Sequence, residues 1–345
     1  MKRILSLSVM VLLAVALIAG CTKTVPSSGP IDTSVTITDV VGRTVTLAKP
    51  ATKVVGTHNP TLNIAIILGG GGKYLVGFGN KNMAGSLYGY VYPELDDVLQ
   101  IGTGRNINFE SCLQMGAELA ILPQRFADLA DQFEAVGIPA AVILPNSESY
   151  DTIKKSIELL GVLLGDEERA AAIIAYYDGK IATAQGIANL ATEHPKAMFL
   201  GASSKLSVAN GAMLQSVMLE TAGAINVAKD VNGGGDFIEV SVEEIIGWNP
   251  EVIYIPSYAS YTVDDLLNDP AWSSIDAIKN NRIYVFPSNL EPWDYPTPST
   301  LMGLTWLLNN LHPDLYSMDQ VLADAREYYE LVYGQSFSAE QLGLN

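Results

Sequence analysis

Cysteine, histidine and basic residues are scarce in this chain. Its 345 residues include two cysteines and three histidines, and 20 Lys and Arg stand against 37 Asp and Glu. Nucleic acid needs a basic surface that neutralises its phosphates, so this charge balance excludes it as a partner. Cys21 belongs to a leader described next, which leaves Cys112 without a cysteine to pair with inside a folded domain. With 48% hydrophobic residues the chain is globular, with length for one large or two medium domains.

A long apolar run from Ile4 to Ala19 follows Lys2 and Arg3 and ends in "LIAGC". It is too short and too clearly terminated for a membrane span, and it predicts a secretory signal. The small residues before Cys21 resemble the bacterial lipoprotein signal, in which that cysteine becomes the lipidated first residue. The alternative is an ordinary cleaved signal that happens to contain a cysteine. We expect residues 1–20 to be the signal peptide and residues 21–33 to be a flexible tether.

The acidic balance of the mature chain bears on its location. Removal of residues 1–20 takes away two basic residues and no acidic ones, so the formal net charge falls from −17 to −19. Such a chain would not bind anionic headgroups directly. We therefore expect an extracytoplasmic protein that is anchored to the cell membrane only through lipid on Cys21.

Strands and helices alternate along residues 34–165. The opening segment "SVTITDVVGRTVTLA" alternates apolar and polar residues around "VGR", which predicts a β-hairpin. Helices and strands then follow one another, as in "FESCLQMGAELAILP" and "FADLADQFEAVGIPAAVILP". This order predicts an α/β lobe with a mainly parallel sheet.

Residues 166–193 interrupt that alternation. They contain no proline and begin with three acidic residues, which the dipole of a helix favours in its first turn. At about 1.5 Å per residue they predict a helix of roughly 40 Å. The alternation resumes in residues 194–345. We therefore predict two Rossmann-like α/β lobes joined by one long rigid helix. A single doubly wound domain would explain neither the helix nor the restart.

Three segments carry a family resemblance. "VTITDVVGRTVTLAKPATKVV" resembles the pattern D..GR.V.L..P..RVV, and "VSVEEIIGWNPEVIYI" resembles VS.E.LL..NPDVI.I. "NFESCLQMGAELAIL" resembles N.E.I..L.PDLVI, although Gly116, Ala117 and Glu118 stand where Pro-Asp is usual. In this order and spacing they resemble the substrate-binding proteins of ABC importers, in the class that serves iron–siderophore, haem and vitamin B12 uptake. The resemblance covers nearly all of residues 34–334.

This resemblance implies that a ligand binds in a cleft between the lobes, that the helix limits lobe motion to a small twist, and that the closed complex docks on a permease. In the family, one glutamate on each lobe meets arginines of the membrane subunits. The matching positions here are Glu110 and Glu243. The alternative for each is a capping or dipole role in the first turn of a helix, and Glu244 lies next to Glu243.

Loops at the carboxyl ends of strands are expected to face the cleft. The first lobe supplies His58, Asn59, Tyr88, Tyr90, Tyr92 and Arg105. The histidine is a candidate hydrogen-bond donor and, less readily, a metal ligand. The tyrosines would share one face in an extended segment and offer apolar rings with polar tips, unless they are buried strand residues. The arginine offers a planar fork to an anionic ligand, unless it is a plain surface residue.

The second lobe supplies Tyr258 and Tyr261 from "PSYASY", and Trp293 and Tyr295 from "EPWDYPTPST". Three prolines stiffen the latter loop, so it could present its two aromatics at little entropic cost. The alternative is that Trp293 packs under the helix that begins near Ser299.

The many tyrosines favour a large ligand, so the expected ligand is an iron complex, with a ferric siderophore first. A corrinoid, haem, or a molybdate or tungstate oxyanion are the alternatives. We expect no cofactor, no directly bound metal and a monomer whose partners are the ligand and the permease. An enzyme is not expected: no Ser–His–Asp, Cys–His or zinc-binding spacing stands out, and a nitrogenase-like enzyme would need more cluster ligands than Cys112. A surface interaction protein without a ligand is the alternative from a different class.

Overall fold

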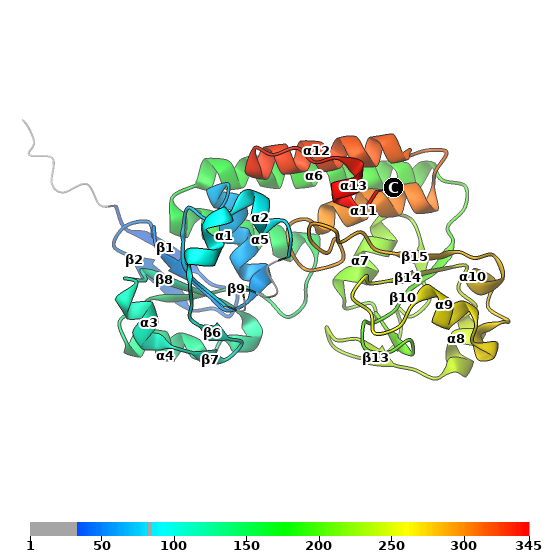
Figure 1. The fold of residues 1–345 in the computed structure, drawn as a ribbon, viewed down its shortest axis with the longest axis horizontal. Coiled ribbons are helices and arrows are strands. Elements are labelled where there is room, and N and C mark those ends of the chain that lie inside the picture. Colours follow the sequence, from blue (N-terminus) through cyan, green and yellow to red (C-terminus); the bar gives the residue numbers. More distant parts are fainter. Residues whose placement is uncertain (1–32, 80, 82–84, 345) are drawn as a thin grey trace, which may run out of the picture. The chain divides into compact units, whose positions relative to one another are not determined.

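The first lobe is built on a five-stranded parallel sheet (Figure 1). The computed structural model describes residues 33–79, 81 and 85–344, so the predicted signal peptide, Cys21 and nearly all of the tether lie outside the described residues. The sheet order is β5-β4-β3-β8-β9 and every neighbouring pair is parallel. Its strands are β3 (Val54–Val55), β4 (Leu75–Phe78), β5 (Leu99–Gln100), β8 (Leu119–Pro123) and β9 (Ala140–Leu144). The last two strands are buried at every residue, as expected of strands covered on both faces.

The helices of this lobe begin and end where the local sequence dictates. Helix α1 (Asn59–Gly69) has proline in its first turn and ends at Gly70, whose φ of 66° suits glycine. Helix α5 (Tyr150–Leu164) begins with a capping box between Ser149 and Thr152. The shorter helices are α2 (Tyr88–Val91), α3 (Phe109–Gln114) and α4 (Leu129–Ala135), and the 3₁₀ turns are η2 (Pro93–Asp97) and η3 (Gln124–Phe126). Two antiparallel hairpins complete the lobe: β1 (Val35–Thr38) with β2 (Thr44–Leu47), and β6 (Gly102–Thr103) with β7 (Asn106–Ile107).

The second lobe has a four-stranded parallel sheet in the order β12-β10-β14-β15. Its strands are β10 (Lys196–Phe199), β12 (Ile225–Asn226), β14 (Val252–Ile255) and β15 (Ile283–Val285). The small pair β11 (Ser207–Val208) and β13 (Ile238–Glu239) is antiparallel. The helical segments are α7 (Leu214–Thr221), α8 (Val242–Trp248), α9 (Val263–Leu267), η4 (Pro270–Trp272), α10 (Asp276–Lys279), α11 (Thr300–Leu311), α12 (Met318–Tyr333) and α13 (Ala339–Leu342).

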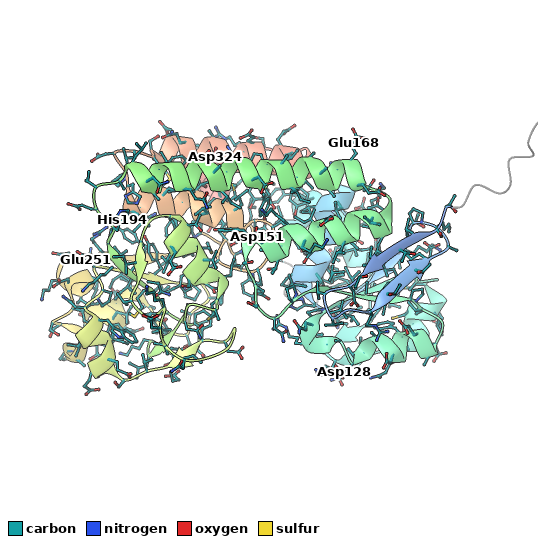
Figure 2. All side chains as sticks on the ribbon, turned by 180° about the vertical axis from the view of Figure 1, so that it is seen from behind. Asp128, Asp151, Glu168, His194, Glu251 and Asp324 are labelled. Atoms are coloured by element: carbon teal, nitrogen blue, oxygen red, sulfur yellow. The ribbon has the colours of Figure 1, made fainter. Side chains whose placement is uncertain are left out.

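The long helix between the lobes is α6 (Glu167–Leu190), whose 24 residues correspond to about 36 Å. It is slightly shorter than residues 166–193 because Ala191 is already extended, with ψ of 137°. Helix α12 runs beside it (Figures 1 and 2). Lys180 on α6 lies 2.5 Å from a carboxylate oxygen of Asp324 on α12, and the hydroxyl of Tyr176 donates to the backbone carbonyl of Asp324 at 3.0 Å.

Helix α12 also reaches the first lobe. The guanidinium of Arg169, at the start of α6, donates to the carbonyl oxygens of Ile67 at 2.9 Å and Val332 at 2.6 Å, which ties the ends of α1 and α12 together. Two helices, not one, therefore connect the lobes. The prediction of two α/β lobes around a long helix is confirmed, and the second helical connection is an addition that the sequence did not reveal.

Candidate functional site

The carboxyl ends of both parallel sheets turn towards one shared region. In the first lobe, β3 leads into His58, β8 leads into Arg125 and β9 leads into Glu148. In the second lobe, β14 leads into Tyr258 and β15 leads into the loop that carries Tyr295. Burial raises the pKa of Tyr295, and the charges of Arg125 and Glu148 also act on it, so side chains of the two lobes lie close to one another here. This is the place where open α/β sheets bind ligands.

On the first lobe, the guanidinium of Arg125 lies between two acceptors. Its Nη2 is 3.2 Å from Nε2 of His58 and 3.6 Å from Oε1 of Glu148. Burial, together with the Arg125 charge, lowers the pKa of His58 to about 3, so this ring is neutral. A neutral imidazole that accepts at Nε2 carries its proton on Nδ1. That nitrogen is buried and has no partner among the described residues.

On the second lobe, Asp294 orders two tyrosines. The hydroxyl of Tyr258 donates to Oδ2 of Asp294 at 2.7 Å, and the rings of Tyr258 and Tyr295 meet edge to face at 5.6 Å. Burial raises the pKa of Asp294 to about 6. Its Oδ1 is buried and lacks a partner within the described part of the chain. Tyr258 itself is 45% exposed, so this cluster has an accessible face.

The lobes touch at two places. The backbone N–H of Leu87 donates to the carbonyl of Leu290 at 3.0 Å, and the hydroxyl of Ser86 donates to the carbonyl of Asn289. At another point Gly235 approaches the first lobe so closely that a Cβ there would lie 2.7 Å from the carbonyl oxygen of Asn146. Contacts at both places describe a closed arrangement of the lobes.

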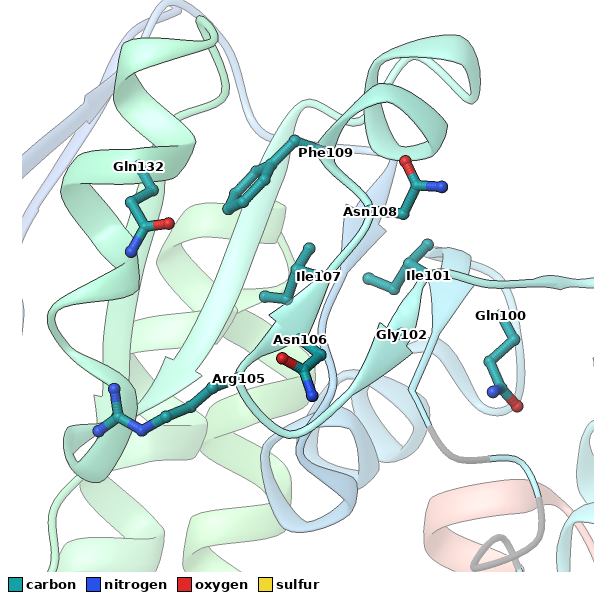
Figure 3. Close-up of a pocket in the computed structure, with 9 residues that line it drawn as sticks. All are labelled: Gln100, Ile101, Gly102, Arg105, Asn106, Ile107, Asn108, Phe109 and Gln132. Carbon is teal, nitrogen blue, oxygen red and sulfur yellow. The ribbon is translucent and has the colours of Figure 1, made fainter.

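Arg105 is placed near the site but is engaged elsewhere. Its Nη1 lies 2.6 and 2.5 Å from the two carboxylate oxygens of Asp128, its Nη2 donates to the carbonyl of Arg125, and its guanidinium lies 5.2 Å from the ring centroid of Phe126. It therefore braces the segment that carries Arg125. Arg105 also lines an open groove of about 690 Å³ on this lobe (Figure 3). The other residues of that groove are Gln100, Ile101, Gly102, Asn106, Ile107, Asn108, Phe109 and Gln132.

The three first-lobe tyrosines do not form the expected shared face. Tyr88 and Tyr90 lie in helix α2, so the expectation of an extended segment is wrong. Tyr88 is buried and its hydroxyl accepts from Asn63 at 3.2 Å, while Tyr92 is buried and donates to the carbonyl of Leu75 at 3.0 Å. Tyr90 is 50% exposed and packs edge to face on Phe337 at 5.5 Å. A helix of four residues is too short to leave a helical period in the sequence, so the alternation of tyrosines was the stronger pattern.

Trp293 is also directed into the core. It is 1% exposed, and its indole N–H donates to the hydroxyl of Tyr329 on α12 at 3.1 Å. In this conformation it presents no face to a ligand, so burial, which was the alternative for this residue, describes it. Tyr261 donates to the carbonyl of Gly201 at 2.8 Å and so holds its own loop. Asn59 is the first residue of α1 and is half-buried.

Arg125, Glu148 and Asp294 lie in this candidate site but were not among the residues expected from the sequence. The signal that could have found Arg125 was present: "PQRF" directly follows the buried strand "LAILP", which is the same rule that selected His58. Glu148 follows the next strand along the sheet after a few polar residues. Asp294 lies between the two aromatics that had drawn attention to its loop.

The two candidate docking glutamates lie on exposed first turns. Glu110 is the second residue of α3, whose N-terminus is capped by Asn108 through a 3.0 Å bond from the N–H of Ser111. On α8, Glu244 completes a capping box with Ser241, with its carboxylate 2.8 Å from the Ser241 N–H. Glu243 is therefore not the residue that caps this helix.

Two features are absent from the part of the chain that the structure describes. Among those residues, no cluster of three or more His, Cys, Asp or Glu is arranged to hold a metal ion. Within the same residues, no helix is both long and apolar enough to cross a membrane.

Residues 63–290 match the family model described as periplasmic binding protein. The chain belongs to this family. The expected class, that of siderophore, haem and vitamin B12 binders, is confirmed, and so is its fold. A periplasmic solute binding protein from Veillonella parvula superposes with a TM-score of 0.78 at 26% identity, covering 90% of this chain and 96% of that one.

Two curated relatives match most of the chain. The molybdate-binding protein MolA of Haemophilus influenzae is 25% identical over 327 residues, which is 88% of this chain and 92% of MolA. An uncharacterized ABC transporter substrate-binding lipoprotein of Bacillus subtilis, YvrC, is 24% identical over 293 residues, which is 82% of this chain and 87% of YvrC. The structure of MolA bound to molybdate has a TM-score of 0.74 at 24% identity and covers 88% of this chain and 99% of its own. The family supports the role of a substrate-binding component of an ABC transporter, which delivers a small ligand to permease subunits.

Proposed function

We propose that this protein captures a small oxyanion of the molybdate or tungstate type between its lobes and delivers it to an ABC importer. The observation that carries the proposal is the position of Arg125. This side chain is 51% exposed and follows a strand at its carboxyl end. It contacts neutral His58 at 3.2 Å and, more loosely, Glu148 at 3.6 Å. Arg guanidinium groups bind oxyanions through paired N–H donors. The relative MolA, which is named as molybdate-binding, points to the same ligand class.

The sequence favoured a ferric siderophore because many tyrosines suggested a wide aromatic wall. Three of the supposed wall residues, Tyr88, Tyr92 and Trp293, are buried in the core. The groups left at the junction of the lobes are mostly polar and compact: an arginine, a neutral histidine, two carboxyls and two tyrosine hydroxyls. A compact site of this kind, with the guanidinium of Arg125 and the unpartnered Nδ1–H of His58 as donors, suits a small oxyanion better than a large chelate.

A ferric siderophore is the second candidate. The edge-to-face pair of Tyr258 and Tyr295 favours it, because Tyr258 is 45% exposed and aromatic faces pack well against organic chelates. In either case the protein would act without catalysis or a resident cofactor, as a monomer outside the cytoplasm. We further propose that lipid on Cys21 anchors it, as expected from the leader.

The ligand is tested by calorimetry and thermal shift on the full chain with molybdate, tungstate, ferric siderophores, haem, cobalamin and nickel–histidine. We expect molybdate and tungstate to stabilise the protein by about 2.7 kcal/mol at a hundredfold excess over Kd. Arg125→Ala should weaken their binding by roughly tenfold to a hundredfold, the value of a charged hydrogen bond. Arg282→Ala is the matched control, because Arg282 precedes β15 at the opposite end of the sheet. Stabilisation by a siderophore alone would select the second candidate, and none by any ligand would refute the transport role.

Docking is tested separately from ligand binding. Glu110→Ala combined with Glu243→Ala should abolish uptake in cells and leave ligand affinity unchanged. Glu167→Ala with Glu168→Ala on the exposed start of α6 serves as the control for loss of two acidic residues. A large loss of affinity in the first double variant would show that these glutamates belong to the site and not to the docking surface.

A further inference from the structure

Glu148 is a partly buried carboxyl whose charge is poorly balanced. It lies between β9 and α5, its side chain is 18% exposed, and its nearest cation is Arg125 at 3.6 Å, beyond ordinary hydrogen-bond length. The same Nη2 of Arg125 lies closer to His58, at 3.2 Å. Burial raises the pKa of Glu148 to about 7, although Arg125 acts against that change. At neutral pH this carboxyl therefore exchanges a proton readily.

Among the residues that the structure describes, the other ionisable groups around Glu148 do not supply a second cation. His58, which directly precedes α1, is neutral. From the second lobe, Tyr295 and Asp294 face the same region, and Asp236 follows Gly235 where that loop meets Asn146. Arg105 reaches the backbone of the Arg125 segment, but its charge is paired with Asp128 at 2.5 Å. An oxyanion bound at Arg125 would thus lie near the carboxylate of Glu148, and the single positive charge of Arg125 would be shared by the two anionic groups.

We propose that Glu148 is a specificity-determining residue of this site, which admits an oxyanion only together with one proton held between the Glu148 carboxyl and a ligand oxygen. This inference rests on the proposed function. An ionised carboxylate only accepts hydrogen bonds and repels a second anion, whereas a protonated carboxyl donates one. The proton comes from solvent, and no covalent bond forms or breaks. With Glu148 neutral, the guanidinium of Arg125 is free to pair with the ligand.

This arrangement separates classes of ligand. An oxyanion gains a donor from protonated Glu148 and takes up a proton on binding. A cationic complex is favoured by the ionised carboxylate and releases a proton instead. A ligand that brings its own hydroxyl donor to this position binds with little proton exchange. The sign of proton exchange therefore reports the chemistry of the group that faces Glu148.

The test is titration calorimetry of the full chain with sodium molybdate between about pH 6.5 and about pH 9, in pairs of buffers that differ in ionisation enthalpy. We expect proton uptake that approaches one per ligand above about pH 8, and a Kd that weakens towards tenfold per pH unit there. Glu148→Gln should flatten this dependence and bind more tightly than the wild type at the highest pH. Glu158→Gln, an exposed glutamate of α5, should leave the slope unchanged.

Asp294→Asn separates the two carboxyls of the site. Its slope above about pH 7 should match the wild type, because the pKa of Asp294 is raised only to about 6. Three outcomes would overturn the role of Glu148 and leave the proposed function intact. They are molybdate binding without proton uptake, a pH dependence of Kd that survives Glu148→Gln, and a pH dependence of Kd that disappears with Asp294→Asn. Absence of molybdate binding to the wild type at every pH would overturn the proposed function and this inference together. Proton uptake is measured on the wild type, so the test does not depend on how the variants fold.

Discussion

The segment from Glu291 to Tyr295 has two sides, and on each side a tyrosine hydroxyl donates to a carboxyl group of the segment. On one side, the hydroxyl of Tyr329 donates to Glu291 at 3.0 Å and accepts from Trp293, all within the core. On the other side, the hydroxyl of Tyr258 donates to Asp294 at 2.7 Å beside Tyr295. Tyr329 is fully buried, whereas Tyr258 is 45% exposed. A tyrosine–carboxyl pair thus joins this loop to α12 on one side and lies at the candidate site on the other.

The sharp division between the two sides depends on a rigid backbone. Proline at positions 292, 296 and 298 fixes φ and limits alternative paths of the loop. Helix α11 packs directly on it, since a Cβ at Gly303 would lie 2.4 Å from the carbonyl oxygen of Trp293. The loop therefore cannot rotate to exchange its core-facing and cleft-facing residues without losing both contacts.

Trp293→Ala should lower the unfolding free energy the most, and it should remove contacts only on the core-facing side of the loop. Removal of a fully buried tryptophan costs about 3–5 kcal/mol of unfolding free energy, and it also leaves the Tyr329 hydroxyl without its indole donor. Chemical denaturation of the full chain measures this cost. Trp248→Ala, on a half-buried tryptophan at the end of α8, is the control and should cost clearly less. Equal costs would show that Trp293 is not part of the core as described.

The contribution of Glu291 to unfolding free energy should be intermediate in size and should depend on pH. Burial raises its pKa to about 7, so the folded protein holds a proton here that the unfolded chain releases near its ordinary pKa of about 4.3. The stability that this group contributes is therefore complete below about pH 4, is lost as pH rises towards about 7, and is constant above that. We expect the loss to be at most about 4 kcal/mol, because each pKa unit of difference corresponds to about 1.4 kcal/mol.

Glu291→Gln isolates this contribution, because glutamine still accepts from Tyr329 and does not titrate. The difference in unfolding free energy between wild type and variant should decline from about pH 4.5 to about pH 7, which cancels the similar but separate effects of Glu148 and Asp294. A difference that is constant with pH would mean that Glu291 keeps its charge in the folded protein.

Much of the fold was predictable, because its signals are local. Capping residues, left-handed glycines such as Gly70 and Gly165, and buried apolar strands place most elements within a few residues. The return of α12 to the first lobe was not predictable, since it depends on contacts such as Arg169 with Val332 that are distant in sequence.

For the candidate site, the strand-end rule selected His58, Tyr258 and Tyr295, which the structure places near the junction of the lobes. Residue type alone made aromatic residues more conspicuous than Arg125 or Glu148. Which side of a loop faces the core is decided by tertiary packing. The sequence "PWDYP" contains no signal that would send the tryptophan inward and the tyrosine towards the cleft.

Tyr295→Phe should have the smallest effect on unfolding free energy, and it should change molybdate affinity without disturbing the core-facing side of the loop. The ring and its edge-to-face contact with Tyr258 are retained, so unfolding free energy should change by less than about 0.5 kcal/mol. Loss of the hydroxyl should weaken molybdate binding by roughly twofold to tenfold, the value of one neutral hydrogen bond. Tyr90→Phe is the matched control, because Tyr90 is exposed on the first lobe against Phe337. If Tyr295→Phe lowered stability as Trp293→Ala does, both sides of the loop would belong to the core. If neither stability nor affinity changed, the ligand would lie nearer to Arg125 and Glu148 than to the second lobe, and closure of the lobes would have to depend on other contacts.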